Sequence, residues 1–535
     1  MIQSVRTQLY WAVIALSILF TALGGRWAWG LLITVPLVVL GTWDHFQASH
    51  GLLRNYPIMG HVRYLIEDTG AELRQYVVES NLDGRPFNRD MRSLIYQRSK
   101  GVADKKPFGT ELDVYQDGYG WMAHSMVPRP VCDDPLREFR VEVGAPGTTR
   151  PYSCSIYNIS AMSFGSLSGA AIRALNEGAR LGEFAHVTGE GGISRYHWEP
   201  GGDLIWQIGT GYFGCRNTEG EFDPELFRDQ AVSEQVKMIE LKLSQGAKPG
   251  HGGILPGGKV TQEIAEARHV PVGVDCISPA HHSAFSTPIG LLEFIASLRE
   301  LAGGKPVGFK LCVGRPHEFY AVCKAMVHTG IVPDFITVDG GEGGTGAAPI
   351  EFSNHVGLPL REGLVFVQNA LVGIGVRDQI RIAGSGKLVS AFHLTTALAL
   401  GADWCNSARG FMFSLGCIQA QSCHTNRCPV GVATQDPRLT RGIVVADKSR
   451  RVANFHRSTV EALAEVVAAA GLDRPRDLTP RLIYGRTSQT EVHTYAGLFE
   501  AFEPGQLLND CCSPRLQYFW DAASAETFAP QDPVG

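Results

Sequence analysis

From residue 152 onward, short apolar runs alternate with stretches of helical periodicity. That alternation is typical of βαβ units, in which parallel strands are buried beneath helices. Eight strand candidates can be counted, the number that closes a (β/α)8 barrel of the TIM type. They lie near Ser155–Ser160, Phe184–Thr188, Met238–Leu243, Val272–Ile277, Val307–Val313, Phe335–Asp339, Ile380–Ala383 and Trp404–Ser407, with helices such as Ser168–Leu181, Pro288–Leu301 and Leu388–Leu400 between them.

A doubly wound open sheet is the alternative α/β fold. Its first strand is normally followed by a G-x-G-x-x-G turn, and Ser163-Phe164-Gly165 does not match that pattern. We therefore predict an α/β chain of four parts: a membrane anchor, a cap, a barrel and a C-terminal helical extension. Their bounds are 1–43 for the anchor, 44–150 for the cap, 151–440 for the barrel and 441–535 for the extension.

Two uncharged, apolar runs open the chain, at residues 9–23 and 27–43, separated by Gly24, Gly25 and Arg26. A membrane span needs about 20 residues, although about 17 can suffice. The runs therefore predict one or two transmembrane helices, and a two-helix hairpin would leave both ends in the cytoplasm. A cleaved signal peptide and a single tilted anchor are the competing interpretations. We expect the rest of the chain to lie on the cytoplasmic side of this membrane.

The net charge is 48 minus 53, or −5, and the chain contains no long basic run. This excludes an obvious nucleic-acid-binding surface. Twelve cysteines at irregular spacing do not resemble a disulfide framework, which indicates a reducing compartment.

Three cysteines stand close together in the stretch 416–435, at Cys417, Cys423 and Cys428. Zinc sites ordinarily use four ligands and shorter steps between cysteines, whereas thiolates spaced around a loop suit an iron-sulfur cluster. Three protein thiolates match a 3Fe-4S cluster. Three unrelated buried cysteines are the alternative, but the Gly, Pro, Asn and His residues between them favour a wrapped loop.

In a barrel, the loops that follow the strands form one rim, where reacting groups gather. Gly384-Ser385-Gly386-Lys387 follows the seventh strand candidate and opens a helix, and Ser407-Ala408-Arg409-Gly410 follows the eighth. Such a pair of loops forms the standard phosphate site of barrels, which would fit flavin mononucleotide (FMN). Lys310, in the fifth strand, would place a positive charge beside the flavin ring or form a rim salt bridge.

The segment Lys242–Gly253 carries two lysines, and Arg268 follows one helix later. Several cations at one barrel mouth predict a pocket for a dicarboxylate, with solvated lysines as the alternative. Glu190, flanked by glycines, would act as a proton donor or a counter-ion. Glu342 is similarly placed, but a role in a turn is at least as well supported. His281 and His282 are candidate rim residues.

Several motifs resemble the FMN-binding synthase domain of glutamate synthase. They are NISAMSFGSLS, TGEGG, ELKLSQGAKPGHGG, ISPAHH, GGTGAAP and CIQAQSCHTNRCPVGVATQ, and they extend from about Ile159 to Arg441. The N-terminal LRNYPIMGHVRYL is similar to stand-alone, membrane-anchored glutamate-synthase-like proteins of bacteria. Two departures are Ile254 and His251, where the family usually has the Gln and the Glu of GEGGQLP.

The resemblance implies an oxidoreductase acting on CH-NH2 donors, in which ammonia and 2-oxoglutarate form an imine that FMN reduces to L-glutamate. It also implies a role for each matching residue. Glu190 and Lys242 would be catalytic, and the oxo acid would be bound by Lys242, Gln245, Gly246, Lys248 and Arg268. The flavin would be bound by Met162, Ser163, Lys310, Gly384, Ser385, Gly386, Ala408 and Arg409. The 3Fe-4S cluster would be held by Cys417, Cys423 and Cys428.

The chain carries no recognisable glutaminase domain or nicotinamide fingerprint. We therefore expect free ammonia, an amine or a separate glutaminase as the nitrogen source, and ferredoxin, a flavoprotein or a membrane donor as the electron source. A related 2-oxo acid could replace 2-oxoglutarate, and a homo-oligomer is left open. Two other functions are compatible with the sequence: formation of an N-alkylglutamate from an amine, and a membrane redox relay without substrate turnover.

Overall fold

The computed structural model describes residues 7–47, 49–144, 148–509 and 513–531. The chain divides into two compact units, residues 1–89 and 90–535. Each unit has its own packing, described in turn below.

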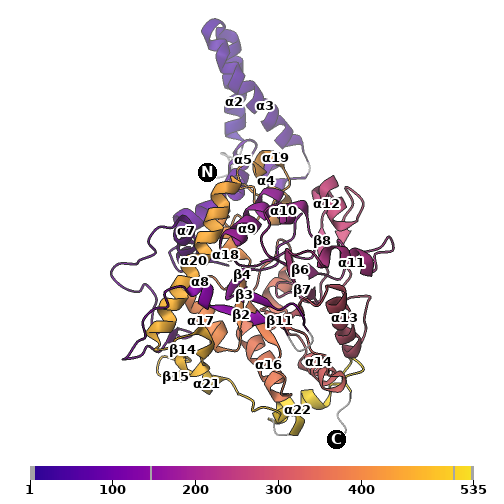
Figure 1. Ribbon diagram of the computed structural model, residues 1–535. Helices are drawn as coiled ribbons and strands as arrows, with labels where there is room; N and C mark the ends of the chain where they lie inside the picture. Colours follow the sequence, from indigo (N-terminus) through magenta and orange to yellow (C-terminus); the bar gives the residue numbers. More distant parts are fainter. Residues whose placement is uncertain (1–6, 48, 145–147, 510–512, 532–535) are drawn as a thin grey trace. The chain divides into compact units, whose positions relative to one another are not determined.

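Eight parallel strands of the second unit close into a barrel, which confirms the predicted TIM-type fold (Figure 1). In order around the barrel they are β4 (Tyr157–Ile159), β5 (His186–Val187), β6 (Leu204–Ile208), β7 (Val236–Lys242), β10 (Val307–Leu311), β11 (Phe335–Asp339), β12 (Arg381–Ser385) and β13 (Trp404–Ser407). The helices that follow or connect these strands are α9 (Gly169–Leu181), α10 (Arg195–Trp198), α11 (Pro224–Ala231), α13 (Pro288–Leu301), α14 (Pro316–Thr329), α16 (Leu360–Gly373), α17 (Ala391–Ala399) and α18 (Arg409–Ser414).

One predicted strand is wrong and one strand was missed. Residues 272–277 do not enter the barrel, because Pro271 and Gly273, the latter at φ 73°, break the apolar run and leave Val272 and Val274 exposed. Only Cys276–Ile277 is extended there, as β9, paired antiparallel with β8 (Ile254–Leu255) in an excursion between β7 and α13. The missed strand is the fully buried β6, Leu204–Ile208.

A hairpin closes the N-terminal end of the barrel. Its strands are β2 (Arg140–Val143) and β3 (Tyr152–Ser155). Val143, Tyr152 and Cys154 pack in one buried cluster with the side chains at the starts of the barrel strands, among them Phe335 and Trp404. The barrel therefore has a filled lower end, and space for a ligand remains only at the mouth where the strands end.

The C-terminal extension packs along the outside of the barrel. Its long helix α20 (Val445–Ala469) lies so close to α9 that a side chain at Gly178 would meet Val452 at 2.4 Å. The extension also contains two strands, β14 (Ile483–Arg486) and β15 (Val492–Thr494), which form a small sheet with β1 (Gly120–Met122). The extension is therefore mixed in structure, with α20 as the longest of its described helices.

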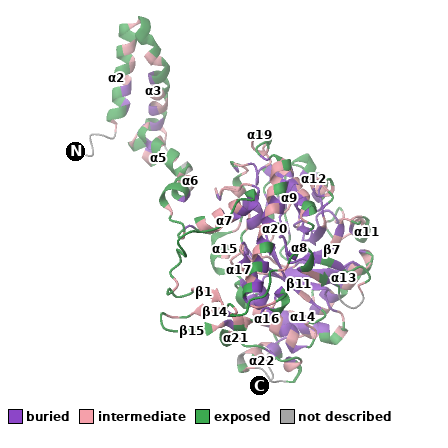
Figure 2. Cartoon of the chain, turned by 60° about the vertical axis from the view of Figure 1, so that its left-hand side comes forward, coloured by how far each residue is buried: buried purple, intermediate pink, exposed green. Residues whose placement is uncertain are grey.

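The first unit begins with an apolar helical hairpin (Figure 2). Helix α2 (Gln8–Leu23) and helix α3 (Leu31–Phe46) are joined by a short 3-10 segment, and the Tyr10 hydroxyl contacts the Thr42 hydroxyl at 2.9 Å between them. Among the described residues one helical stretch, Gly25–Phe46, is long and apolar enough to cross a membrane, and α2 is a shorter apolar helix. After the hairpin come α4 (Gly51–Asn55), α5 (Met59–Asp68) and α6 (Gly70–Leu73).

Candidate active site

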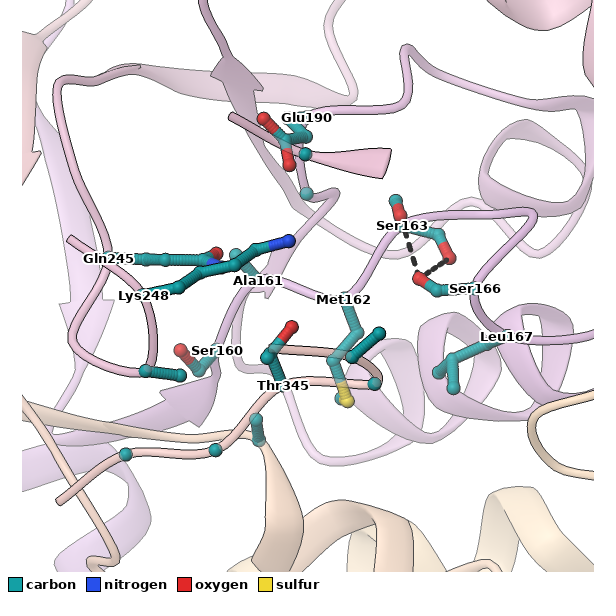
Figure 3. A pocket seen from close by; sticks show the side chains of 18 of the residues that line it. Ser160, Ala161, Met162, Ser163, Ser166, Leu167, Glu190, Gln245, Lys248 and Thr345 are labelled. Carbon is teal, nitrogen blue, oxygen red and sulfur yellow. Dashed lines mark hydrogen bonds between the residues drawn. The ribbon is translucent and has the colours of Figure 1, made fainter. Parts of the chain in front are cut away.

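A large pocket opens at the C-terminal mouth of the barrel (Figure 3). The loops that follow the barrel strands form its walls, so residues far apart in the sequence face one another across it. The predicted site residues that line this pocket are Met162, Ser163, Glu190, Lys242, Gln245, Lys248, Arg268, Lys310, Ser385, Gly386, Ala408, Arg409 and Cys423.

Two predicted glycines stand beside the pocket without lining it. Gly246 allows two loops to meet, because a side chain there would lie 1.8 Å from the Gly340 carbonyl oxygen. Its amide donates to the Asp339 carboxylate at 2.9 Å. Gly384 lies inside β12, next to Leu364 and other helix side chains, so it helps α16 and α17 to cover the strand.

An ion pair crosses the pocket wall between β5 and β7. The Lys242 ammonium group lies 2.9 Å from a carboxylate oxygen of Glu190, and both side chains are largely buried. Burial alone would raise the pKa of Glu190, but the positive charges of Lys242, Arg268 and Lys248 together hold it below its ordinary value. Glu190 is therefore ionised at neutral pH, as a counter-ion for Lys242.

Lys248 and Arg268 line the pocket without a carboxylate partner among the described residues. Lys248 is 7% exposed, and in the described part of the chain its ammonium group forms no ion pair. Burial lowers the pKa of Lys248, and the charge of Glu190 partly opposes that effect. Figure 3 draws Lys248 and Gln245 extending side by side into the pocket.

Arg268, the last residue of α12 (Gln262–Arg268), is the second such cation. Its guanidinium group donates to the Phe164 carbonyl at 3.1 Å and to the Ser163 hydroxyl at 3.4 Å, and it lies over the ring of Phe213. None of these partners carries a negative charge, so the guanidinium forms no ion pair among the described residues.

The fourth cation, Lys310, is paired. Its ammonium group lies 3.3 Å from the Asp339 carboxylate, on the neighbouring strand β11. Burial alone would lower the pKa of Lys310, but the nearby charges of Asp339, Glu240 and Glu190 raise it above its ordinary value. Lys310 is therefore a stable positive charge at the base of the pocket.

Two polar residues of the site, Glu240 and Gln207, were not predicted from the sequence. Glu240 is 2% exposed and accepts hydrogen bonds from the Gln207 amide and the Thr337 hydroxyl, each at 2.6 Å. Gln207 also lines the pocket, and it lies on β6, the strand that was missed. The spacing could have identified Glu240, because it stands two residues before Lys242 on the same strand and therefore faces the same side of the sheet.

The loops after the seventh and eighth strands both line the pocket, where Ser385, Gly386 and Ala408 contribute small side chains. The Ser385 hydroxyl lies 3.3 Å from that of Ser160, which follows β4. Arg409 donates to the Thr345 carbonyl at 2.6 Å. The expected helix after the seventh strand begins only at Ala391, because the Ser390 side chain caps that position.

The cysteine loop borders the pocket through Cys423. Burial, and to a smaller degree the nearby Cys423 and Cys428 thiols, raise the pKa of Cys417 to about 11, so the three sulfur atoms interact electrostatically. The Gln419 amide donates to the Cys417 sulfur at 3.5 Å, and the Lys259 ammonium group donates to the Cys423 carbonyl at 2.9 Å.

The backbone of this loop is unusually curved. Gln419, Gln421 and Asn426 all have left-handed φ values, of 58°, 56° and 63°. Within the described ranges no group of three or more His, Cys, Asp or Glu side chains is placed to hold a single metal ion. The three thiols of this loop, with an amide donor at one sulfur and the Lys259 ammonium group at the loop backbone, are the donor set that an iron-sulfur cluster would need.

The remaining candidates take structural positions. Glu342 accepts from the Leu360 amide at 2.9 Å at the start of α16, which favours its role in a turn. His282 is buried, lies 2.8 Å from the Lys242 carbonyl and 3.1 Å from the Tyr212 hydroxyl, and burial lowers its pKa to about 4. Neutral His282 thus supports the backbone of Lys242, whereas His281 is exposed.

The sequence model of a conserved region in glutamate synthase matches residues 153–473. The chain belongs to the glutamate synthase family. This confirms the resemblance and the predicted class, an oxidoreductase. The matched region contains the whole barrel, the cysteine loop and all of α20.

Two relatives illustrate the range of the family. The chain is 39% identical over 513 residues to the glutamate synthase large subunit-like protein YerD of Bacillus subtilis, covering 88% of this chain and 97% of that protein. It is 35% identical over 317 residues to the archaeal-type glutamate synthase (NADPH) of Thermotoga neapolitana, covering 59% of each. The chain therefore spans less than two thirds of the second relative.

Among solved structures, the flavin-binding domain of baker's yeast flavocytochrome b2 is 11% identical, with a TM-score of 0.39, covering 84% of this chain and 90% of that one. A likeness this weak supports no inference about the site.

Replacing Lys242 by methionine should raise the pKa of Glu190, because less positive charge then opposes the rise in pKa that burial causes. In the native chain the ion pair should persist at neutral pH and be lost only as the pH falls through the lowered pKa of Glu190. An infrared titration of the protonated carboxyl stretch, assigned with Glu190→Gln, measures this. Lys237→Met, on the same strand but paired with Asp203, is the control; an unchanged Glu190 titration in Lys242→Met would contradict the assignment.

Proposed function

We propose that this chain catalyses the reductive amination of 2-oxoglutarate, or of a closely related 2-oxo acid, to the corresponding amino acid. The charge balance of the pocket supports this most directly. Of its five buried cations, Lys242 and Lys310 are paired with carboxylates, and Lys259 donates to the Cys423 and Ala433 carbonyls beside the cysteine loop. Lys248 and Arg268 remain, and neither forms an ion pair in the described ranges. Two uncompensated buried cations suit a ligand with two carboxylates.

We assign one substrate carboxylate to Lys248 and the other to Arg268. Arginine binds a carboxylate through two parallel hydrogen bonds and therefore orients it, whereas lysine supplies a point charge. The Arg268 side chain is already fixed by its bonds to Phe164 and Ser163. Binding thus requires little reordering on the protein side, and the oxo carbon is held in one orientation.

The chemical step needs one proton donor at the nitrogen. Ammonia adds to the oxo carbon and water leaves, and the resulting imine takes a hydride on carbon and a proton on nitrogen. Because the pKa of Glu190 is held low, we assign the donor role to Lys242 and the counter-ion role to Glu190. Water-mediated return of a proton to Lys242 completes the cycle.

The remainder of the pocket fits FMN. The small side chains of Ser385, Gly386 and Ala408 leave room for a phosphate beside their backbone amides, and Arg409 and Lys310 add positive charge. Bound FMN would supply the hydride that the imine carbon accepts. Met162 and Ser163 line the same pocket and follow β4, the strand that pairs with β13.

Two electrons must be returned after each turnover by an external donor, which we take to be ferredoxin, a flavoprotein or a membrane carrier. Cys417, Cys423 and Cys428 would hold a 3Fe-4S cluster, which transfers electrons singly. The position of Cys423 in the pocket wall supports a short distance between the cluster loop and the flavin site.

The apolar hairpin supports attachment to a membrane. Helix α2 has 16 residues, or about 24 Å, against a hydrocarbon core of about 30 Å, and Gly25–Phe46 has 22 residues. Trp27 and Trp29, 50% and 73% exposed at its turn, suit a membrane interface. We propose a bacterial inner-membrane anchor with both ends in the cytoplasm.

Reduced, FMN-loaded protein mixed with 2-oxoglutarate and ammonium chloride should reoxidise and release glutamate. Lys248→Met should raise the KM for 2-oxoglutarate about 10- to 100-fold, because a charged hydrogen bond contributes about 1.5–3 kcal/mol. Anaerobic flavin absorbance and product chromatography measure both effects, with Lys237→Met as the control. If the protein were a redox relay without substrate turnover, Lys248→Met would leave electron transfer unchanged. If methylamine reoxidised the flavin in preference to ammonium, formation of an N-alkylglutamate would be favoured.

Cys423→Ser should abolish the electron paramagnetic resonance signal of an oxidised 3Fe-4S cluster and lower the iron content, since a ligand is lost. Cys132→Ser, whose thiol lies outside the loop, should retain both. If native protein contains no iron or acid-labile sulfide after anaerobic reconstitution, the cluster assignment is wrong.

The full chain should fractionate with membranes and require detergent for release. Leu19→Arg combined with Val39→Arg should shift it to the supernatant, because each arginine costs about 2.5–3.5 kcal/mol at the centre of a span. Leu498→Arg, equally exposed but in the second unit, is the matched control. Native protein in the supernatant would contradict the anchor.

A further inference from the structure

Helix α5 exposes its apolar side chains instead of burying them. Met59, Val62 and Ile66 stand at positions i, i+3 and i+7 and therefore share one face of the helix, with Leu65 at its edge. These four residues are 49% to 64% exposed. A surface helix of a globular protein turns such a face toward the core. Exposed here, the face is an apolar surface that calls for a covering partner.

The opposite side of α5 already has its packing partner. A side chain at Gly60 would lie 2.7 Å from Leu53 of α4. One turn later, the ring of Tyr64 meets that of His50 edge to face, with 6.1 Å between the ring centroids. Gly60 and Tyr64 are four residues apart and so lie on the same side of the helix. The apolar face is therefore directed away from α4.

Hydrogen bonds tie α5 to the base of the apolar hairpin (Figure 2). His61 Nε2 lies 2.9 Å from both carboxylate oxygens of Asp44, a buried residue in the last turn of α3. The Ile58 amide donates to the same carboxylate at 2.9 Å. Because a carboxylate is strongly disfavoured in the hydrocarbon core, Asp44 marks the end of the span. Helix α5 is consequently held at the depth of the membrane surface.

Apolar side chains are also exposed before and after α5 in the first unit. In the last turn of α3, Trp43 and Phe46 are 72% and 76% exposed, and tryptophan is enriched at membrane interfaces. After α5, Val77 and Val78 are exposed in the π-helical turn Arg74–Val78. The base of the hairpin, α5 and the segment that follows it thus share this property.

The charges of this segment are balanced, so electrostatic attraction does not select its partner. Residues 51–78 contain three arginines and three acidic residues. On α5 itself, Arg63 lies 2.6 Å from Glu67 as an exposed ion pair beside the apolar face. Attraction to anionic lipid or to an acidic protein surface requires an excess of basic residues. A zwitterionic lipid surface, which accepts apolar side chains below its headgroups, fits this segment better.

We propose that α5 lies flat in the membrane interface beside the hairpin, with its apolar face among the glycerol and upper acyl groups of zwitterionic phospholipid. The proposal rests on the membrane anchor proposed above, to which it adds a third helix that lies in the surface without crossing it. Continuity identifies the occupant, because α5 is bonded to the base of a hairpin that stands in the same bilayer.

A photoreactive p-benzoylphenylalanine residue in place of Ile66 tests this contact in the full chain, reconstituted in phosphatidylcholine vesicles. Irradiation should attach phosphatidylcholine to the peptide that carries the probe, as measured by mass spectrometry after digestion. The matched control is the same probe in place of Glu67, on the polar side of α5, where we expect about tenfold fewer lipid adducts.

The yield at position 66 should also be insensitive to salt, because the charges of the segment are balanced. Raising NaCl from about 0.1 M to about 1 M shortens the Debye length from about 10 Å to about 3 Å and would weaken an electrostatic contact. Equal yields at positions 66 and 67, or a yield at position 66 that is lost at high salt, would contradict the apolar contact.

A probe in place of Val39, an exposed residue of α3, reports on the hairpin independently. Lipid adducts at position 39 without adducts at position 66 would overturn the interfacial helix and leave the anchor intact. Absence of adducts at both positions would overturn the anchor and this proposal with it. A cross-linked dimer at position 66 would identify a second copy of the chain as the occupant, and a cross-link to residues 90–535 would identify the second unit. Either result would overturn the lipid contact.

Discussion

Closure of eight parallel strands into a barrel with one filled end is the constraint on which the rest of this structure depends. The β2–β3 hairpin occupies the lower end, so the only open mouth is where the strands terminate. All side chains that follow a strand are therefore directed to one small volume. Burial there makes an unpaired charge energetically unfavourable, so each cation in the pocket must be balanced by the protein or by a ligand.

The pattern of charge pairing follows from this desolvation cost. The two lysines at strand ends, Lys242 and Lys310, each meet a carboxylate from a neighbouring strand or loop, which fixes their positions. Lys248 and Arg268 lie on the excursion after β7. In the described ranges, no strand pairing places an acidic residue beside either of them. The excursion thus supplies the charge left for substrate, while the barrel itself supplies the fixed chemistry.

The same excursion also packs closely against the site. Its glycines allow the backbone at Gly252 to approach the Ser278 carbonyl and the backbone at Gly253 to approach Glu190. The positions at which the chain departs from the family motif, His251 and Ile254, lie in this excursion, and Ile254 lines the large pocket.

The sequence by itself determined the fold class and the seventh- and eighth-strand loops, because periodicity and strand-end polarity are local properties. Partly through the family resemblance, it also identified some of the residues that line the pocket. It could not distinguish Leu204–Ile208 from Val272–Ile277 as the barrel strand, since both are short apolar runs and only packing decides which one is buried. Nor could it tell which cations are paired. Whether Glu190 donates a proton or balances Lys242 depends on a distance of 2.9 Å between groups that lie 52 residues apart in sequence, and only the tertiary structure sets such a distance.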